Sequence, residues 1–172
     1  MKDLLDKLPG LAKKSERETK KFLNHLQHKP PKDLDKVMEN LHEETFCKTD
    51  CMQCANCCKT TGPLFLRPDI DRISKYLKMK PTDFETQFLH QDEDNDVVLQ
   101  QLPCVFLNAD NSCNIYDVRP RACKEFPHTD RKKFYQINHL TLKNVAICPA
   151  TYEIVEKMKL LYAAKNEDKF RK

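Results

Sequence analysis

The chain has 172 residues, of which 40% are hydrophobic and 33% charged, with no Trp and only two Gly. Its net charge of +4 arises from 30 Lys and Arg against 26 Asp and Glu. The two signs are interspersed, which is not the pattern of a nucleic-acid-binding protein. No segment approaches the ~20 apolar residues of a membrane helix, and the charged N-terminus lacks the apolar run of a signal peptide. We therefore expect a cytoplasmic protein with neither a nucleic-acid nor a membrane partner.

The first third of the chain predicts two helices, at residues 13–28 and 31–44. The second helix has Leu34, Val37 and Leu41 at helical spacing, which gives it one apolar stripe. Together these helices form a predicted N-terminal extension over residues 1–46, which leads into a cysteine cluster domain at residues 47–150.

Two further helices are predicted after the first group of cysteines. Apolar residues repeat at helical spacing from Leu66 to Leu77, and Pro81 opens a shorter helix that ends near Leu89. The pattern then changes to a β-rich one over residues 97–116, with a turn at residues 108–112, which predicts a strand or a hairpin.

The last part of the chain predicts a short helix or turn at residues 117–126, a second hairpin at 133–147 and an amphipathic helix at 150–165. Residues 151–172 are assigned to a C-terminal helix and tail that pack on the same domain. The predicted fold class is mainly α with a small β-hairpin, in a compact, cysteine-rich, metal-stapled single domain.

Nine cysteines dominate the chemistry of the sequence, and five of them lie in the stretch CKTDCMQCANCC from residue 47 to residue 58. In a reducing compartment a disulfide framework is disfavoured, and an odd count with an adjacent Cys-Cys pair fits such a framework badly. Thiolates are soft donors for zinc, ferrous iron and iron–sulfur clusters, and a CxxC turn directs two sulfurs at one ion. The cluster therefore predicts metal binding.

Eight of the cysteines are candidate ligands, four local and four remote. They are Cys51, Cys54, Cys57, Cys58, Cys104, Cys113, Cys123 and Cys148. Eight thiols suffice for two four-thiolate sites, for one iron–sulfur cluster and one zinc, or for one occupied site with spare thiols. Because adjacent side chains project in different directions, we expect Cys57 and Cys58 to serve different sites.

The same stretch can also be read as a second motif, which begins at Cys47. Cys47, Cys51 and Cys54 spell CxxxCxxC, the spacing of radical SAM enzymes, but that chemistry needs an aromatic residue where this chain has Gln53. The chain after the motif is also too short for the βα barrel that holds SAM, and Gly62 is its only glycine. The match is therefore interpreted as coincidence, which leaves Cys47 as a ninth ligand or a free thiol.

The ordered pieces CMQCANCC, PCVFL, NSCNIYDVRPRACKEFP and Cys148-Pro149 resemble the zinc- or iron-chelating domain of YkgJ-like cysteine cluster proteins. The resemblance spans residues 51–149 and implies bound zinc or iron, with an iron–sulfur cluster as one possible form, held by the eight cysteines in up to two sites. It implies no settled reaction. The chain departs from the pattern in its 108–112 turn, which has no Gly.

Other motif residues have expected roles beside the cysteines. Arg119 and Arg121 either offset thiolate charge or anchor their turn, and Tyr116 and Phe126 are expected in the core. His128 is a further candidate ligand, although a lone His is more often a hydrogen-bonded surface residue.

The function predicted from the sequence is metal binding, with no assigned cellular role. The alternatives are an iron–sulfur redox or enzymatic protein that acts with a partner, and a metal-handling protein. The sequence contains no GxSxG, Walker A or HExxH motif. Enzymatic activity and the identity of a protein partner are therefore left open.

Overall fold

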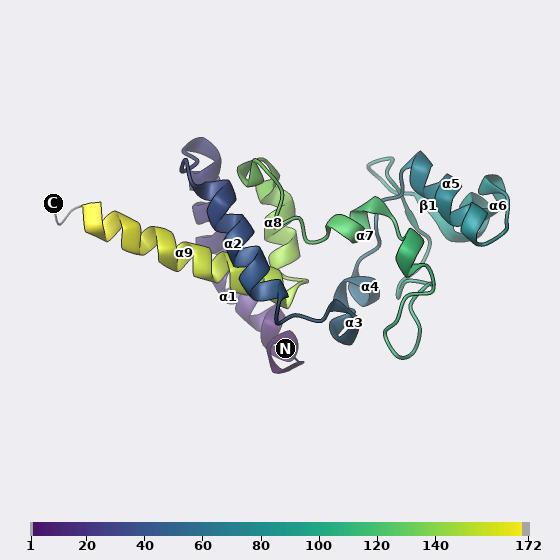
Figure 1. The fold of residues 1–172 in the computed structure, drawn as a ribbon, viewed down its shortest axis with the longest axis horizontal. Helices are drawn as coiled ribbons and strands as arrows, with labels where there is room; N and C mark the ends of the chain where they lie inside the picture. The colour runs from purple at the N-terminus through teal and green to yellow at the C-terminus, as the bar shows by residue number, and fades with distance from the viewer. Residues whose placement is uncertain (1, 170–172) are drawn as a thin grey trace. The chain divides into compact units, whose positions relative to one another are not determined.

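The computed structural model describes residues 2–169, with side chains for residues 3–164. The described chain is mainly helical with one small antiparallel sheet, which confirms the predicted mainly α fold class with a small β-hairpin (Figure 1), whereas metal stapling remains a prediction. The residues gather in two units, which are described separately. The helical unit comprises residues 1–50 and 127–172, and the cysteine unit comprises residues 51–126. The domain division predicted at residues 47 and 150 remains a prediction.

The helical unit is built from long helices around an apolar core. Its described elements are α1 (Lys2–His28), α2 (Leu34–Phe46), the 3-10 helix η2 (Phe134–Ile137), α8 (Asn138–Val145) and α9 (Pro149–Lys169). Helix α9 packs against α1, α2 and α8, and its Ile154 and Met158 are fully buried with Met38 of α2. The predicted helices at 13–28, 31–44 and 150–165 are thus confirmed. Residues 170–172 of the predicted tail lie outside the described residues.

Helix α1 begins eleven residues earlier than predicted. Pro9 and Gly10 look like a helix break in the sequence, but Pro9 lies inside the helix. Leu8 and Ala12 are buried on either side of this pair, at the spacing of one helical turn. Tertiary packing of this stripe outweighs the local cost of the Pro–Gly pair.

The predicted hairpin at residues 133–147 is wrong, because this segment forms η2 and α8. Its buried positions include Phe134, Thr141 and Val145, which recur at helical spacing. A polar residue within this stripe hides the helical period from a reading of apolar residues alone. The Asp35 carboxylate stabilises the beginning of η2, because it accepts the amide hydrogens of Lys133 at 2.8 Å and Phe134 at 3.2 Å.

The cysteine unit consists of short elements around a second, smaller core. Its described elements are α3 (Cys51–Cys54), α4 (Asn56–Thr60), α5 (Arg67–Tyr76), α6 (Pro81–Phe88), β1 (Leu89–Gln91), β2 (Val97–Leu99), the 3-10 helix η1 (Tyr116–Val118) and α7 (Arg121–Glu125). Ile73 of α5, Phe84 of α6 and Ile115 before η1 are among its most deeply buried residues. The helices predicted at 66–77 and from Pro81 are confirmed.

The small hairpin is present, but its strands differ from the predicted ones. Strand β1 pairs with β2 in an antiparallel register that places Leu89 opposite Leu99. The connecting turn depends on Asp92, whose Oδ1 accepts the amide hydrogens of Asp94 and Asp96. The turn predicted at 108–112 closes only an isolated bridge between Leu107 and Cys113.

Candidate metal centre

The cysteine unit contains seven of the eight predicted ligands, and all nine cysteines of the chain are thiols. Cys51 and Cys54 lie in α3, Cys57 and Cys58 in α4, Cys104 and Cys113 in the loop between β2 and η1, and Cys123 in α7. Cys148 belongs to the helical unit, where it directly precedes α9 and donates its amide hydrogen to the Asn144 carbonyl at 2.8 Å.

The turn between α3 and α4 orients the local cysteine motif. Cys51 and Cys54 are three residues apart in one helical turn, so their side chains share a face of α3. Ala55 then adopts a left-handed backbone with φ of 47° and begins α4, which carries Cys57 and Cys58. The motif is therefore divided between two helices, and the second pair of cysteines lies on α4 rather than on a continuation of α3.

The remote Cys104 is attached to the end of this motif by the backbone. Its amide hydrogen is donated to the Cys58 carbonyl at 2.8 Å, and its own carbonyl accepts the Leu107 amide hydrogen at 3.0 Å. The loop that carries Cys104 therefore starts beside Cys58.

Cys113 directly follows the 108–112 turn and pairs with Leu107, on the other side of the turn, in an isolated antiparallel bridge. The turn contains no Gly, and Asn111 takes the left-handed position instead, with φ of 67°. The Asn111 side chain also donates to the Gln53 carbonyl at 3.2 Å, which ties the turn to α3. Asn is therefore an adequate replacement for the Gly that the motif leads one to expect.

The charge of one thiol acts on three others, and these four form what we call the four-thiol group. They are Cys58, Cys104, Cys113 and Cys123. Burial, together with the charge of Cys58, raises the pKa of Cys104 to about 11 and that of Cys123 to about 12. The pKa of Cys113 is also raised, first by burial and also by Cys58. Three of the four thiols therefore hold their protons at neutral pH until a cation replaces them.

Cys58 is the exception within the group. A hydrogen bond from the Cys57 thiol, whose sulfur lies 4.0 Å away, lowers the pKa of Cys58 to about 7 against the effect of burial. Two sulfurs bound to one tetrahedral ion at about 2.3 Å lie about 3.8 Å apart. The observed separation is thus also compatible with a shared ion, and the assignment of Cys57 and Cys58 to different sites remains a prediction.

The backbone presents further groups that favour thiolates. The amide hydrogens of Phe106 and Leu107 point at the Cys104 sulfur and that of Ile115 points at the Cys113 sulfur; each of these contacts lowers the pKa of its thiol. Such contacts stabilise negative sulfur and are what a metal-bound thiolate requires.

Arg119 supplies positive charge to the four-thiol group. Its charge lowers the pKa values of Cys113 and Cys123, although burial keeps both raised overall. The guanidinium lies 3.9 Å from the centre of the Tyr116 ring and donates to the Tyr116 carbonyl at 2.7 Å. The turn-anchoring role of Arg119 is therefore seen, and compensation of thiolate charge at a bound metal remains a prediction.

Two other expectations near this turn are corrected. Tyr116 is expected in the core but is 45% exposed, and its ring packs against the Arg119 guanidinium instead. The Arg121 guanidinium pairs with Glu125 of the same helix at 2.5 Å on the surface. Phe126 is half-buried at the end of α7.

The donor set fits a soft metal ion in its chemistry, since it offers four thiols, directed amide hydrogens and one nearby cation. Among the described side chains, no three Cys, His, Asp or Glu residues are already placed to hold one ion. The thiols therefore have to lose protons and move closer together when a metal binds.

The two candidate extra ligands lie in the helical unit. Cys47 follows α2, is exposed and donates its thiol hydrogen to the Glu44 carbonyl at 3.0 Å. His128 has a left-handed backbone with φ of 65°. Metal binding by either residue remains a prediction.

Sequence reasoning missed Asp69 and Arg72, which hold the segment before Cys123. Asp69 is 2% exposed and accepts hydrogen bonds from Arg72 and from the amides of Leu66 and Arg121. Burial raises the pKa of Asp69, but these hydrogen bonds and the Arg72 charge outweigh it, and the pKa is lowered overall. The signal was an Asp three residues after the leucine that precedes Arg67-Pro68, which is the capping position of a helix start.

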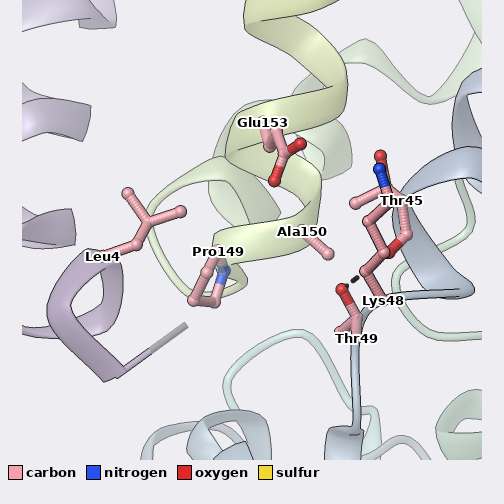
Figure 2. A pocket seen from close by; sticks show the side chains of 7 residues that line it. All are labelled: Leu4, Thr45, Lys48, Thr49, Pro149, Ala150 and Glu153. Atoms are coloured by element: carbon pink, nitrogen blue, oxygen red, sulfur yellow. Dashed lines mark hydrogen bonds between the residues drawn. The ribbon is translucent and has the colours of Figure 1, made fainter.

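The helical unit contains a cavity of about 210 Å³ between the first turn of α1, the end of α2 and the start of α9 (Figure 2). Its lining combines apolar side chains with two hydroxyls and one charge of each sign. The residues are Leu4, Thr45, Lys48, Thr49, Pro149, Ala150 and Glu153. This set includes none of the predicted metal ligands.

Within the described residues, no helix is both long enough and apolar enough to cross a membrane. No solved structure matches the chain. The model of the CxxCxxCC family, whose description reads "Putative zinc- or iron-chelating domain", matches residues 50–142, more than half of the chain. The matched range includes seven of the eight predicted ligands, and the prediction of metal binding is supported at the level of the family. The chain therefore belongs to the CxxCxxCC family of zinc- or iron-chelating domains.

Proposed function

We propose that the chain binds zinc or iron through the four-thiol group and that the metal holds the cysteine unit together. The observation that carries this proposal is that the charge of Cys58 reaches Cys104, Cys113 and Cys123 and raises the pKa of each. These residues come from α4, from both sides of the 108–112 turn and from α7. One ion bound to all four would cross-link segments that are far apart in the sequence.

The composition of the cysteine unit supports a stabilising role for the metal. Its core has eight buried apolar residues, its strands have three residues each, and the helices that carry cysteines have only four or five. Helices this short are unstable without tertiary support. A structural zinc contributes on the order of 10–16 kcal/mol to folding, which exceeds the usual net stability of a domain.

The remaining predicted ligands are Cys51, Cys54, Cys57 and Cys148. The family resemblance makes them further candidate ligands, and their role is kept as part of this proposal without a division between ions. The choice between a single zinc, a single iron and an iron–sulfur cluster is likewise part of the proposal, because four thiolates suit all three.

A redox role is the second candidate function. All four thiols of the group are half-buried rather than fully enclosed, and an electron-transfer partner can therefore approach a cluster bound there. Solvent exposure and hydrogen bonds to sulfur are also the features that set the potential of such a cluster. A metal-handling role requires in addition that the ion exchanges readily.

Anaerobic purification followed by metal analysis and absorption spectroscopy tests these alternatives. A colourless protein with stoichiometric zinc supports the structural role, whereas a brown protein with matching iron and sulfide supports the redox role. Rapid loss of metal to a weak chelator supports metal handling.

The ligand set is tested with cysteine variants of the full chain. Cys58→Ser and Cys123→Ser are each expected to remove one ion or cluster per chain. Cys47→Ser, at the exposed thiol before the motif, tests the ninth ligand separately, since it leaves the metal content unchanged if Cys47 is a free thiol. Full metal content in both ligand variants contradicts the four-thiol assignment, and a wild-type chain without zinc or iron contradicts metal binding altogether.

A further inference from the structure

Helix α7, which carries Cys123, lacks the usual means of starting a helix. It has only five residues, and its N-cap is Pro120, whose side chain makes no capping hydrogen bond. The first amide groups of a helix need partners outside the helix. For α7 this partner comes from a different part of the cysteine unit.

Asp69 of α5 caps α7 from a distance of 52 residues in the sequence. Its Oδ1 accepts the amide hydrogen of Arg121, the first residue of α7, at 3.1 Å. Its Oδ2 accepts the Leu66 amide hydrogen at 3.1 Å, at the start of α5. One buried carboxylate therefore joins the beginnings of two helices.

Arg72 holds the same segment by donating hydrogen bonds to the backbone carbonyl groups of that segment. Its Nη2 donates to the Arg119 carbonyl at 2.9 Å and to Asp69 Oδ1 at 2.6 Å, and its Nε donates to the Val118 carbonyl at 3.2 Å. The planar guanidinium thus binds two successive carbonyls and the capping carboxylate in one geometry, which a lysine side chain cannot reproduce.

We propose that Asp69 and Arg72 are positioning residues that place the Cys123 thiol for metal binding. Their contacts hold residues 118–121 by both carbonyl and amide groups, and Cys123 follows two residues later on the first turn of α7. The contacts described for the pair go to backbone groups and to each other, so the pair acts on Cys123 through the backbone. This inference rests on the proposed function, since it assumes that Cys123 binds the metal.

Residue-resolved alkylation of the metal-loaded full chain tests the inference. The wild type and Asp69→Asn are exposed to iodoacetamide, and the labelling rate of each cysteine is measured by peptide mass spectrometry. Asp69→Asn should raise the labelling rate of Cys123 at least tenfold and leave that of Cys58 nearly unchanged. Zinc affinity, measured by competition with a chromophoric chelator, should fall about 10–100-fold, as for other outer partners of metal ligands.

Two further variants separate positioning from general destabilisation. Asp71→Asn is the matched control on the same helix, because Asp71 is exposed and pairs only with Arg67 among the ion pairs described; it should change neither quantity. Arg72→Lys keeps a positive charge beside Asp69 but loses the forked contacts, and it should reproduce the effect on Cys123 in part.

The outcomes distinguish failure of this inference from failure of the proposed function. If the metal does not protect Cys123 in the wild type, the four-thiol proposal fails. If it does, but Asp69→Asn either leaves Cys123 protected or exposes all four thiols equally, the positioning role is overturned.

Discussion

The amide of Cys104 donates its hydrogen to the carbonyl of Cys58 at 2.8 Å, and this bond connects the local cysteine motif to the remote cysteines. The chain then passes through the 108–112 turn, which returns Cys113 to the position opposite Leu107. Two cysteines that are distant in the sequence are thereby brought to the motif by backbone hydrogen bonds, before any metal contributes.

Removal of the metal is expected to unfold the cysteine unit and to leave the helical unit folded. The helical unit has thirteen buried apolar residues in its core and the cysteine unit has eight, so only the second should depend on the metal. Hydrogen exchange of the full chain with and without a strong chelator measures this. Residues 51–126 should lose protection and α2 should keep it; equal loss in both units, or no loss, would contradict the prediction.

The backbone of Ala55 makes the break between α3 and α4 sensitive to substitution. A left-handed conformation costs a non-Gly residue roughly 1–2 kcal/mol, and a β-branched residue pays more. Because Ala55 has φ of 47° and is 4% exposed, Ala55→Val should lower the free energy of unfolding by more than ~1 kcal/mol and weaken metal binding.

Ala55→Gly is the matched variant for this prediction. It should keep wild-type metal content and a similar stability, since the relief of strain and the greater freedom of the unfolded chain nearly cancel. Chemical denaturation with metal titration measures both variants. A valine variant as stable as the glycine variant would show that the left-handed turn is not required.

The sequence predicted the parts of this molecule that depend on local pattern. The helical stripes of α2, α5 and α9 and the motif cysteines are visible because their spacing repeats over neighbouring residues. Predictions failed where a distant contact decides the structure. Residues 133–147 became helical with the help of Asp35, and Tyr116 remained exposed beneath Arg119. Asp69 was missed for the same reason, since the amide of Arg121 that it caps is remote in the sequence.

A buried hydroxyl in α8 offers a way to stabilise the helical unit. Thr141 is 1% exposed, and its Oγ1 has no hydrogen-bond partner among the described residues. Leaving such a group unsatisfied costs roughly 1–3 kcal/mol, so Thr141→Val should raise the free energy of unfolding by about 1 kcal/mol. Thr49 is the control, because its hydroxyl donates to the Thr45 carbonyl at 2.9 Å; Thr49→Val should give no gain. A loss of stability in Thr141→Val would mean that the hydroxyl has a partner in solution.

The contact between Tyr162 of α9 and Asp33 predicts how the helical unit responds to alkaline pH. Burial raises the pKa of Tyr162, and the Asp33 carboxylate, which accepts its hydroxyl hydrogen at 3.1 Å, raises it further. A raised pKa means that the folded chain keeps a proton that the unfolded chain releases near pH 10. The contribution of protonated Tyr162 to the free energy of unfolding is therefore complete below about pH 10 and is lost as the pH rises beyond that value.

Tyr162→Phe should remove this part of the alkaline dependence, whereas Tyr76→Phe, at a 53% exposed position, should leave it unchanged. Thermal unfolding between pH 8 and pH 11, followed by helical circular dichroism, measures the dependence. Absorbance of tyrosinate near 295 nm provides a second readout, in which the Tyr162→Phe variant lacks the ionisation of Tyr162, whose pKa is raised. If the wild type and Tyr162→Phe lose stability in parallel above pH 10, the contact with Asp33 does not set the alkaline limit.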